Sequence, residues 1–409
     1  MSEVKKNIPA LRFPEFSSDD YKVHSFQDIF CFKTGKNIKQ SEASPEFEIP
    51  CVRYGELYYM YKEVITKIVN KTSLDKSELL FSDGDEILLP SAGEDPLDIG
   101  SASALIMKNV AIGRTINILK PLKKGIYSQI YASFYINHRL RRKISTLAKG
   151  SSISNVYNSD LKKLKIVLPT LPEQQKIATF LSSVDKKIGQ LTEKKELLEE
   201  YKKGVMQKVF SREIRFKEEG GSAFEEWEER KLGEFMSIPN KEKADNIDKD
   251  KLLTVKLHQK GLLKNKNTDS LNLGSTIYYK RNKGDFIYGK QNLFNGAFGI
   301  IPPEFDGFYT SGDIPTLSLN KNKIVSTFLI AFLGRPSFYS RLENIASGTG
   351  SKRIHENTLL NIKIAYPSLP EQQKIANFLT SLDRKIEAVG KELEGVKEWK
   401  KGLLQGMFV

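Results

Sequence analysis

The chain has 409 residues, enough for two or three domains that each bury a core of their own. Hydrophobic residues make up 39% and charged residues 28%, which is typical of an ordinary soluble globular protein. The 64 lysines and arginines outnumber the 50 acidic residues, and the net charge of +14 favours a polyanionic partner such as nucleic acid.

Charge alone leaves other partners open, because ribosomal components, an anionic membrane or a merely basic surface would fit it as well. The first residues contain no apolar stretch long enough for a secretory signal. The most apolar run, residues 325–334, is about half as long as a bilayer requires. With only two cysteines, Cys31 and Cys51, no disulfide framework is expected, and the sequence predicts a cytoplasmic protein without membrane contact.

The first globular unit is expected at residues 1–168. Short apolar or alternating runs bounded by Gly, Asp or Pro, such as 85–90 and 104–109, predict strands and turns, and residues 127–148 predict a helix. Near its start the sequence LRF (11–13) precedes the aromatic Tyr21. These patterns together predict an α+β domain.

A loop of small polar residues follows that helix and is the best candidate in this unit for contact with DNA. Glycines let backbone N–H groups approach phosphate closely, while Ser, Asn, Lys and Arg donate to phosphates or base edges. An ordinary surface loop beside a solvated charged helix is the alternative. The candidate DNA-binding residues are Arg139, Arg141, Arg142, Lys149, Ser151, Ser152, Ser154 and Asn155.

A long helix is expected at residues 169–210. Thr170 and Glu173 have the spacing of a capping box, and Pro172 falls in the first turn, where a missing N–H costs nothing. Apolar residues then recur at alternating spacings of four and three, which is the heptad pattern of a coiled coil. The predicted seam consists of Ile177, Leu181, Val184, Ile188, Leu191 and Leu198.

The second globular unit, expected at residues 211–366, has the same outline with different residues. IRF (214–216) precedes Trp227, residues 276–290 and 314–319 predict strands, and residues 325–346 predict a helix. A polar turn and a second small-polar loop supply side chains that can contact bases or phosphates. The candidate DNA-binding residues are Lys290, Gln291, Asn292, Arg341, Ser347, Thr349, Ser351, Lys352, Arg353 and His355.

A second long helix, at residues 367–409, repeats the first. The segment LPEQQKIA (171–178) returns at 369–376, and residues 169–188 match residues 367–386 at 15 of 20 positions without a gap. Ser368 and Glu371 again have capping-box spacing. The second seam consists of Ile375, Leu379, Leu382, Ile386, Val389, Leu393 and Val396.

The simplest interpretation of two matching seams is that the long helices pack against each other. Two unrelated amphipathic helices on separate domains are the alternative. Lys202 and Lys400 interrupt the seams, and Tyr201 and Trp399, one residue earlier in each helix, are expected to cover the gaps.

The sequence contains no motif for catalysis, for a metal or for a cofactor. KTGK (33–36) has only the tail of a phosphate-binding loop, and GTG (348–350) is too short for a dinucleotide loop. The four histidines lie far apart, and the cysteines lack metal-ligand spacing. We therefore expect a non-catalytic protein without metal or cofactor, with a nuclease of scattered active-site residues as the alternative.

Two dissimilar domains, each followed by a long helix, resemble the specificity subunit of type I restriction–modification systems over essentially the whole chain. The helices begin PTLPEQQKIATFL and PSLPEQQKIANFL and end YKKGVMQ and WKKGLLQ. The resemblance implies that 1–168 and 211–366 are target-recognition domains, and that 169–210 and 367–409 form an antiparallel coiled-coil pair. The expected fold is thus α+β, with two globular domains separated by two long helices and an internal pseudo-two-fold repeat.

By the same resemblance, the chain reads a bipartite, asymmetric target in double-stranded DNA and docks two methyltransferase subunits, and motor–endonuclease subunits complete the complex. Helices about 50 Å long would hold two readers on half-sites about one DNA turn, or 34–36 Å, apart. A stand-alone DNA-binding regulator is the alternative function.

The chain departs from an ideal repeat in two ways. The first small-polar loop lacks a counterpart of Gly350 and of the basic pair at 352–353. Gly204 and Gly402 interrupt their helices at a cost of about 1 kcal/mol each relative to Ala. They predict the ends of the helices or, alternatively, a close approach of another chain.

Overall fold

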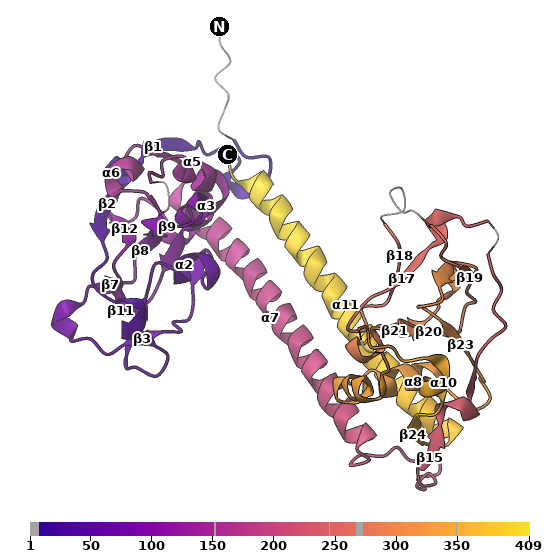
Figure 1. The fold of residues 1–409 in the computed structure, drawn as a ribbon. Coiled ribbons are helices and arrows are strands. Elements are labelled where there is room, and N and C mark those ends of the chain that lie inside the picture. Colours follow the sequence, from indigo (N-terminus) through magenta and orange to yellow (C-terminus); the bar gives the residue numbers. More distant parts are fainter. Residues whose placement is uncertain (1–7, 151–152, 245, 267–272, 349) are drawn as a thin grey trace. The chain divides into compact units, whose positions relative to one another are not determined.

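The computed structural model describes residues 8–409 apart from 151–152, 245, 267–272 and 349 (Figure 1). The chain forms two compact units: unit 1 comprises Met1–Glu193 with Gly390–Val409, and unit 2 comprises Lys194–Val389. Each unit combines a mixed body of helices and strands with parts of two long helices. The predicted architecture, two α+β domains with long helices that pack together, is confirmed.

Two five-stranded sheets form the centre of unit 1, with strand orders β2-β12-β8-β10-β5 and β3-β6-β4-β11-β7. In the first sheet β12 pairs antiparallel with both β2 and β8, and β10 pairs parallel with β5. The strands of the first sheet are β2 (Phe30–Thr34), β5 (Val64–Ile65), β8 (Glu86–Pro90), β10 (Ser103–Leu105) and β12 (Ile116–Pro121). Those of the second are β3 (Ala43–Ser44), β4 (Ile49–Val52), β6 (Lys71–Thr72), β7 (Phe81–Asp83) and β11 (Lys108–Ile112).

Two strand pairs and several short helices complete unit 1. The pairs are β1 (Lys22–Ser25) with β14 (Lys165–Leu168), and β9 (Ala92–Gly93) with β13 (Ser154–Asn155). The short helices are α1 (Phe26–Ile29), α2 (Glu56–Tyr59), α3 (Pro96–Ile99) and α6 (Asn158–Leu161), with the 3₁₀ turns η1 (Pro14–Phe16), η2 (Gln40–Glu42) and η3 (Lys76–Glu78).

Strand β8 lies at the centre of the core of unit 1. All five of its residues are buried, as expected for a strand covered on both faces. Leu88 packs with Leu105, Ile116 and Ile118 from the neighbouring strands. The buried Glu86 accepts hydrogen bonds from the backbone N–H groups of residues 83–85, so its charge is compensated where the strand begins.

The helix predicted at 127–148 is present but interrupted. It consists of α4 (Gln129–Tyr135), one π-helical turn η4 (Ile136–Leu140) and α5 (Arg141–Ser145). The apolar side of α4, including Tyr131 and Phe134, is completely buried. The π turn contains Arg139 and directly precedes Arg141 and Arg142, and such turns are often found at functional sites.

Unit 2 has one four-stranded sheet, with the order β16-β23-β20-β21, and three strand pairs. The sheet strands are β16 (Met236–Ser237), β20 (Phe286–Tyr288), β21 (Phe298–Ile300) and β23 (Thr316–Leu319). The pairs are β15 (Glu228–Lys231) with β24 (Lys363–Tyr366), β17 (Leu253–Val255) with β18 (Leu262–Lys264), and β19 (Tyr278–Lys280) with β22 (Tyr309–Ser311).

In unit 2 the prediction of one continuous helix at 325–346 is wrong, because this segment is divided into three shorter helices. They are α8 (Ser326–Leu333), α9 (Pro336–Tyr339) and the 3₁₀ helix η9 (Ser340–Ile345). Pro336 cannot continue the hydrogen-bond pattern of α8 and disfavours helical geometry in the residue before it. The other short helices are α10 (Glu356–Leu360), η5 (Leu232–Glu234), η6 (Lys249–Lys251), η7 (Leu293–Asn295) and η8 (Pro303–Phe305).

The two long helices are α7 (Leu171–Phe210) and α11 (Leu369–Met407). Both continue through their glycines, so the prediction that the helices end at Gly204 and Gly402 is wrong. Of the predicted seam, the residues that are buried are Ile177, Leu181, Val184, Ile188, Leu191, Ile375, Leu379, Leu382, Val389 and Leu393. The remaining three, Leu198, Ile386 and Val396, are half-buried.

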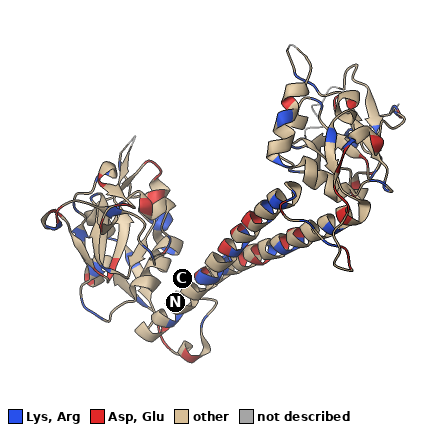
Figure 2. Cartoon of the chain, turned by 90° about the horizontal axis from the view of Figure 1, so that it is seen from below, with Lys and Arg blue, Asp and Glu red and all other residues tan. Residues whose placement is uncertain are grey.

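Ion pairs within each unit give the direction of the helix packing. In unit 1 the first half of α7 lies beside the last part of α11, where Lys187 is 2.8 Å from Glu392 and Lys400 is 2.8 Å from Asp185. In unit 2 the last part of α7 lies beside the first half of α11, where Lys202 pairs with Asp383. The helices are therefore antiparallel. Basic and acidic residues are interspersed along both helices (Figure 2).

The residues that interrupt the seams are covered differently from the prediction. Lys202 and Lys400 are compensated by aspartates of the opposite helix rather than by the neighbouring aromatics. The side chains of Tyr201 and Trp399 are 54% and 52% exposed. A lysine can lie along an apolar seam because its methylene stem packs there while its ammonium group reaches a carboxylate.

Candidate nucleic-acid interface

The duplicated helix start holds the first segment of each unit through a buried carboxylate. Glu173 accepts two hydrogen bonds of 2.8 Å from the guanidinium of Arg12 and one of 3.0 Å from the Tyr21 hydroxyl. In unit 2, Glu371 accepts bonds of 3.3 and 3.1 Å from Arg215.

In unit 2, Trp227 takes the place that Tyr21 has in unit 1, because its indole N–H donates to the Glu371 carboxylate over 2.9 Å. Both glutamates are 0% exposed. The capping-box prediction is therefore wrong: these carboxylates bind an arginine and an aromatic donor instead of the helix backbone. A buried carboxylate requires a charged partner, which explains the arginine of LRF and IRF and the aromatic that follows each.

The next residue of the repeat attaches the long helix to the domain helix. Gln174 accepts from the backbone N–H of Ser128, the residue that precedes α4, and donates to the Pro169 carbonyl. Gln372 accepts in the same way from Val325, the residue that precedes α8, and donates to the Pro367 carbonyl. The PEQQ sequence thus fixes two dissimilar domains on two equivalent helices.

The two small-polar loops, here named loop 1 (residues 149–156) and loop 2 (residues 347–354), have the same backbone frame. In loop 1 the backbone groups of Lys149 and Asn155 exchange two hydrogen bonds, of 2.9 and 2.8 Å. In loop 2 Ser347 and Arg353, each 198 residues later, exchange bonds of the same lengths. The ends of each loop are therefore joined by the same pair of backbone bonds, over the same number of residues.

A glycine is required at the second position of each loop. Gly150 has φ of +124° and Gly348 has φ of +121°, a region that other residues rarely adopt. A Cβ atom would lie 2.1 Å from the Ile153 carbonyl oxygen in loop 1 and 2.6 Å from that of Ser351 in loop 2. The repeat therefore conserves a loop shape within one chain while the exposed side chains differ.

The end of each loop is attached to the domain core in the same way. The N–H of Val156 donates to the Ser91 carbonyl over 3.0 Å, and the N–H of Ile354 donates to the Lys290 carbonyl over 2.9 Å. The last loop residue also accepts from a buried side chain: the Val156 carbonyl accepts from Asn117, and the Ile354 carbonyl accepts from the Tyr288 hydroxyl. Sequence analysis missed both donors, because neither belongs to a motif.

In unit 2 the structure brings the polar turn that follows β20 beside loop 2. The N–H of Lys290 donates to the Asp313 carbonyl over 2.9 Å, and the Asp313 carboxylate lies 3.4 Å from Arg353. Gln291 is half-buried and Asn292 exposed next to this junction, and His355 is exposed at the start of α10. Residues 290–292, 313 and 353–355 therefore form one polar surface.

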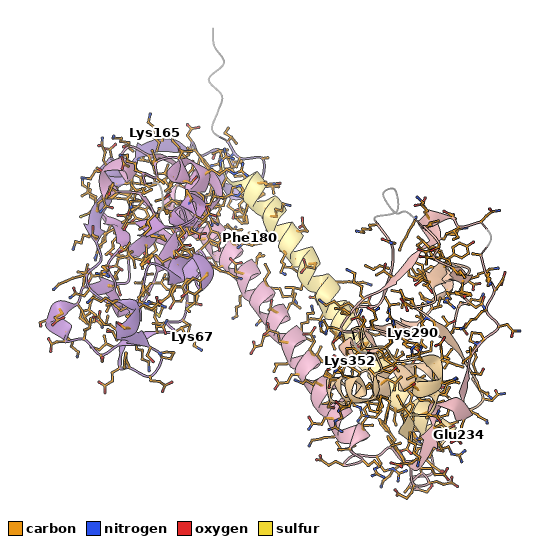
Figure 3. All side chains as sticks on the ribbon, viewed as in Figure 1. Lys67, Lys165, Phe180, Glu234, Lys290 and Lys352 are labelled. Carbon is orange, nitrogen blue, oxygen red and sulfur yellow. The ribbon has the colours of Figure 1, made fainter. Side chains whose placement is uncertain are left out.

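The side chain of Lys290 is mostly buried and forms an ion pair within the protein. Its ammonium group lies 3.1 Å from Glu356, and the two side chains are 12% and 9% exposed. Burial would raise the pKa of the Glu356 carboxyl, but hydrogen bonds from its own N–H, Lys290 and Lys241 hold that pKa below its ordinary value. A DNA contact through the ammonium of Lys290 would have to compete with this pair. Figure 3 labels Lys290 and Lys352, which come from different segments of unit 2.

The other basic candidates of unit 2 lie at the surface. Arg341 is exposed, and Lys352 lies 2.7 Å from Glu343 with about half of each side chain exposed. Exposed ion pairs of this kind contribute little stability, about 0–1 kcal/mol, so Lys352 can exchange its partner for a phosphate at small cost. The predicted residue Thr349 lies outside the described residues.

In unit 1 the basic candidates surround the π turn. Arg139, Arg141 and Arg142 line a hollow of about 390 Å³ with His138 and Asn137. Arg141 is tied to α3, because it donates to the Leu97 carbonyl over 2.9 Å. Burial and the neighbouring Arg139 lower the pKa of His138, so the imidazole is neutral near pH 7.

The remaining candidates of unit 1 lie in loop 1. Lys149 is 3.2 Å from Asp160, and Asn155 donates to the Ile153 carbonyl. Ser154 is buried in the pairing with β9. Ser151 and Ser152 lie outside the described residues.

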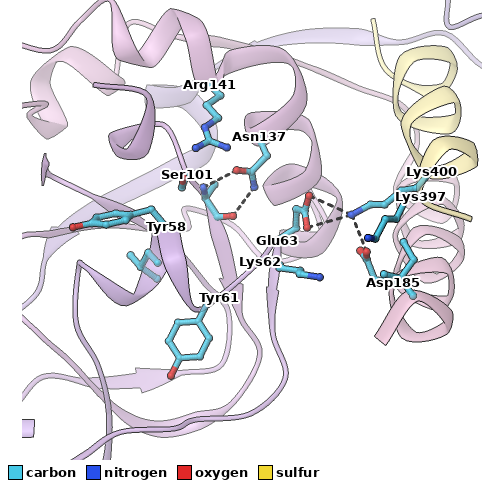
Figure 4. Close-up of a pocket in the computed structure, with 13 residues that line it drawn as sticks. Tyr58, Tyr61, Lys62, Glu63, Ser101, Asn137, Arg141, Asp185, Lys397 and Lys400 are labelled. Atoms are coloured by element: carbon cyan, nitrogen blue, oxygen red, sulfur yellow. Dashed lines mark hydrogen bonds and ion pairs between the residues drawn. The ribbon is translucent and has the colours of Figure 1, made fainter. Parts of the chain in front are cut away.

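A second hollow in unit 1, of about 370 Å³, separates the domain from the long helices (Figure 4). Lys400 crosses its edge and lies 2.8 Å from Asp185 and 3.4 Å from Glu63. On the domain side, Asn137 donates to the Ala102 carbonyl over 2.6 Å. The two ion pairs of Lys400 therefore link α11 to α7 and to the domain at the edge of this hollow.

A cluster of carboxylates in unit 1 is occupied by a lysine. Within the described residues, Asp83, Asp85 and Glu86 are the one group of three whose ligand atoms lie close enough to share a cation. The ammonium group of Lys120 bonds to Asp83 and lies 3.3 Å from Asp85 and 3.2 Å from Glu86. The cluster is thus an internal ion-pair network. In the same described part of the chain, no helix is both long and apolar enough to cross a membrane.

Comparison with known proteins identifies the relatives of this fold. The model of the family described as "Type I restriction modification DNA specificity domain" matches the chain twice, at residues 18–200 and 224–398. The MjaVIII type I restriction enzyme specificity subunit of Methanocaldococcus jannaschii is 28% identical over 98% of this chain and 93% of its own length. The StySPI specificity subunit of Salmonella potsdam is 22% identical over 78% of this chain and 72% of its own length.

Among solved structures, the type I restriction–modification S subunit from M. genitalium superimposes with a TM-score of 0.62 at 18% identity. The alignment covers 98% of this chain and 99% of that subunit. At this level of identity the likeness shows that the fold is shared.

Proposed function

Because the chain belongs to the type I restriction–modification DNA specificity family, we propose that it reads a bipartite, asymmetric DNA target for a restriction–modification complex. It is a non-catalytic subunit. Each unit contributes one target-recognition domain, residues 1–168 and 211–366, and loop 1 and loop 2 carry part of the DNA contact. The observation that carries the proposal is the pair of loops, which have one backbone frame and different side chains.

The different side chains account for an asymmetric target. Where loop 1 has Ile153, Ser154 and Asn155, loop 2 has Ser351, Lys352 and Arg353. Small polar groups and basic groups donate to different base edges. Two readers on an equivalent frame therefore recognise two different half-sites. In this proposal the antiparallel helices at 169–210 and 367–409 set the separation of the two half-sites that are read, and double-stranded DNA is the shared partner.

A duplicated aromatic surface supports docking of two methyltransferase subunits. In unit 1 the rings of Phe13 and Phe180 meet edge to face at 5.8 Å, and Trp399 packs on Phe180 at 5.8 Å. In unit 2 Phe216 and Phe378 meet at 5.6 Å. Phe378 lies 198 residues after Phe180.

The exposed aromatics extend this surface along each helix. Trp399 and Tyr201 occupy equivalent positions and are more than half exposed. Gly402 and Gly204 follow three residues later and therefore lie on the same helix face. Among the described residues, no atom apart from the nearby backbone of the same helix lies within 4 Å of a Cβ built at either glycine. An exposed aromatic beside a glycine costs helix stability and suits close approach of another chain.

A surface that occurs twice on one chain fits the same partner twice. We therefore propose that each copy of this aromatic surface docks one methyltransferase subunit, and that motor–endonuclease subunits join the assembly through the resulting complex. The recognition domains differ between the units, whereas this aromatic surface is repeated. A repeated surface suits a partner that binds both units.

The proposal is tested by co-expressing the chain with its methyltransferase subunit and measuring the mass of the purified complex. The same complex then selects DNA from a random pool. We expect two methyltransferase subunits per chain and a selected sequence with two different half-sites at a fixed separation. A chain that selects the same bipartite site alone and binds no methyltransferase would instead be a stand-alone regulator.

A further inference from the structure

The turn between β11 and β12, residues 113–115, lies beside loop 1. The N–H of Ser91 donates to the Thr115 carbonyl over 2.9 Å, and the carbonyl of Ser91 accepts from Val156, the last residue of loop 1, over 3.0 Å. One residue therefore bridges the turn and the loop. The two segments belong to one surface of unit 1.

The backbone of this turn is fixed on three sides. The N–H of Gly113 donates to the Val52 carbonyl over 2.9 Å, and that of Arg114 donates to the Asn37 carbonyl over 2.8 Å. Thr115 has φ of +66°, which is strained for a β-branched residue and persists only where the surroundings enforce it. A Cβ at Gly35 would lie 1.9 Å from the Gly113 carbonyl oxygen, so residues 35–38 pack directly against the turn.

The side chain of Arg114 is presented by this rigid turn. Arg114 is exposed. Within the described part of the chain its guanidinium makes no ion pair. A guanidinium offers five N–H donors in a planar fork and pairs with O6 and N7 of guanine through two hydrogen bonds. A fixed backbone lowers the entropy lost when such a side chain binds.

Unit 2 has a different arrangement at the equivalent place. Asp313 lies 198 positions after Thr115, and Gly312 lies 198 positions after Arg114. Asp313 occupies the same backbone position, because its carbonyl accepts from the N–H of Lys290 just as that of Thr115 accepts from Ser91. Unit 2 instead has its arginine in loop 2, where Arg353 lies 3.4 Å from Asp313. Each unit thus presents an arginine at this surface, from a different segment.

We propose that Arg114 is a base-reading residue of the first recognition domain and donates to a guanine of its half-site. The inference rests on the proposed DNA-reading function and adds a residue and a base to it. Loop 1 has no arginine, so the turn at 113–115 supplies the guanine contact that Arg353 is placed to make in unit 2.

The test uses the full chain in complex with its methyltransferase subunit and selects DNA from a random pool. Arg114→Ala is compared with Arg114→Lys, which keeps the charge but loses the planar fork. Lys124→Ala is the matched control, because Lys124 is an exposed basic residue beyond the opposite end of β12. Circular dichroism verifies that all variants fold.

We expect Arg114→Ala and Arg114→Lys to lose preference for guanine at one position of one half-site by about tenfold or more. The other half-site and the Lys124→Ala selection stay unchanged. If affinity instead falls equally for all DNA sequences and depends less on salt, Arg114 contacts a phosphate, and the base-reading role is overturned. An unaltered selection would overturn it too. A wild-type complex that selects no bipartite site would refute the proposed function itself, which is a separate outcome.

Discussion

Lys400 of α11 lies 2.8 Å from Asp185 of α7, and the residues at the equivalent positions of the repeat, Lys202 and Asp383, form the same ion pair. An antiparallel pair of equal helices generates each contact twice, once in each unit. The pairs differ in burial. The side chains of Lys400 and Asp185 are 14% and 24% exposed, whereas those of Lys202 and Asp383 are 26% and 56% exposed.

The difference in burial predicts unequal costs for equivalent substitutions. Lys400→Ala leaves Asp185 and Glu63 without their cation in a partly desolvated place and should cost about 2–3 kcal/mol. Lys202→Ala removes a more exposed pair and should cost less than about 1 kcal/mol. The measurement is urea unfolding of both variants, with Asp185→Asn in a double-mutant cycle. Equal costs for the two lysines would contradict the account.

The arginines that hold the buried glutamates should be among the most sensitive residues of the chain. Arg12→Ala leaves Glu173 buried and uncompensated, with an expected cost of about 3–5 kcal/mol. Arg12→Ala with Glu173→Gln should recover part of this loss, because no buried charge remains. Hydrogen exchange locates the effect: protection should fall in unit 1 and stay unchanged in the recognition domain of unit 2. Loss of protection restricted to the first few residues would show that the pair is dispensable.

Loop 2 contains two glycines whose substitution by alanine should have opposite effects on DNA binding. Gly348→Ala places a Cβ 2.6 Å from the Ser351 carbonyl oxygen at a positive φ, so the loop must change shape. In the part of the chain that the structure describes, a Cβ at Gly350 meets nothing within 4 Å beyond the adjacent residues. We expect Gly348→Ala to reduce binding to the complete target about tenfold or more by loss of one half-site, and Gly350→Ala to change it much less. Fluorescence anisotropy with the methyltransferase complex measures both. Identical affinities would remove loop 2 from the DNA interface.

The duplicated aromatic surface predicts stepwise loss of methyltransferase. Trp399→Ala should yield complexes with one methyltransferase subunit fewer, and so should Tyr201→Ala. The double variant should bind none. Lys203→Ala, an exposed neighbour on a different face of α7, serves as the control. Native mass spectrometry measures the subunit numbers, and a double variant that still binds two subunits would place the docking site elsewhere.

The core of unit 1 should lose stability in alkali. Burial, with a smaller effect of Glu56, raises the pKa of the Cys51 thiol to about 12. The unfolded chain releases this proton near pH 8.5 and the folded chain keeps it, so the unfolded state binds fewer protons between these values. The free energy of unfolding should therefore fall as pH rises from about 8.5 towards 12. Urea midpoints at pH 8 and 11 measure this, and Cys51→Ala should show a smaller decrease. Equal decreases would assign the pH dependence to other groups, such as Tyr61.

The helices of this chain could be predicted because their signals are local. Pro172, the heptad spacing from Ile177 onwards and the repeated LPEQQKIA lie within one segment, and each long helix begins two residues after its predicted start. The role of Glu173 could not be predicted in this way. Its spacing from Thr170 fits a cap, but its partner Arg12 lies 161 residues away, and a buried carboxylate prefers a guanidinium.

The residues of the proposed DNA surface can be located from the sequence only in part, for the same reason. The loop glycines recur at a fixed offset, so the frame shared by loop 1 and loop 2 was visible in the sequence. Lys290 looked available for DNA because its partner Glu356 lies 66 residues further on, in α10. The turn at Arg114 was missed because a single arginine between two strands has no motif. Its role depends on neighbours that only the fold brings together.

A genome-wide map of modified bases in the source cell, with and without this gene, shows whether this chain selects the DNA target. We expect methylation at one bipartite motif with two unlike half-sites, lost when the gene is deleted and restored by the wild-type gene. Restoration with Arg114→Ala should return a motif that is relaxed at one position of one half-site. Methylation that is present at a bipartite motif and unchanged by the deletion would contradict the claim that this chain selects the target.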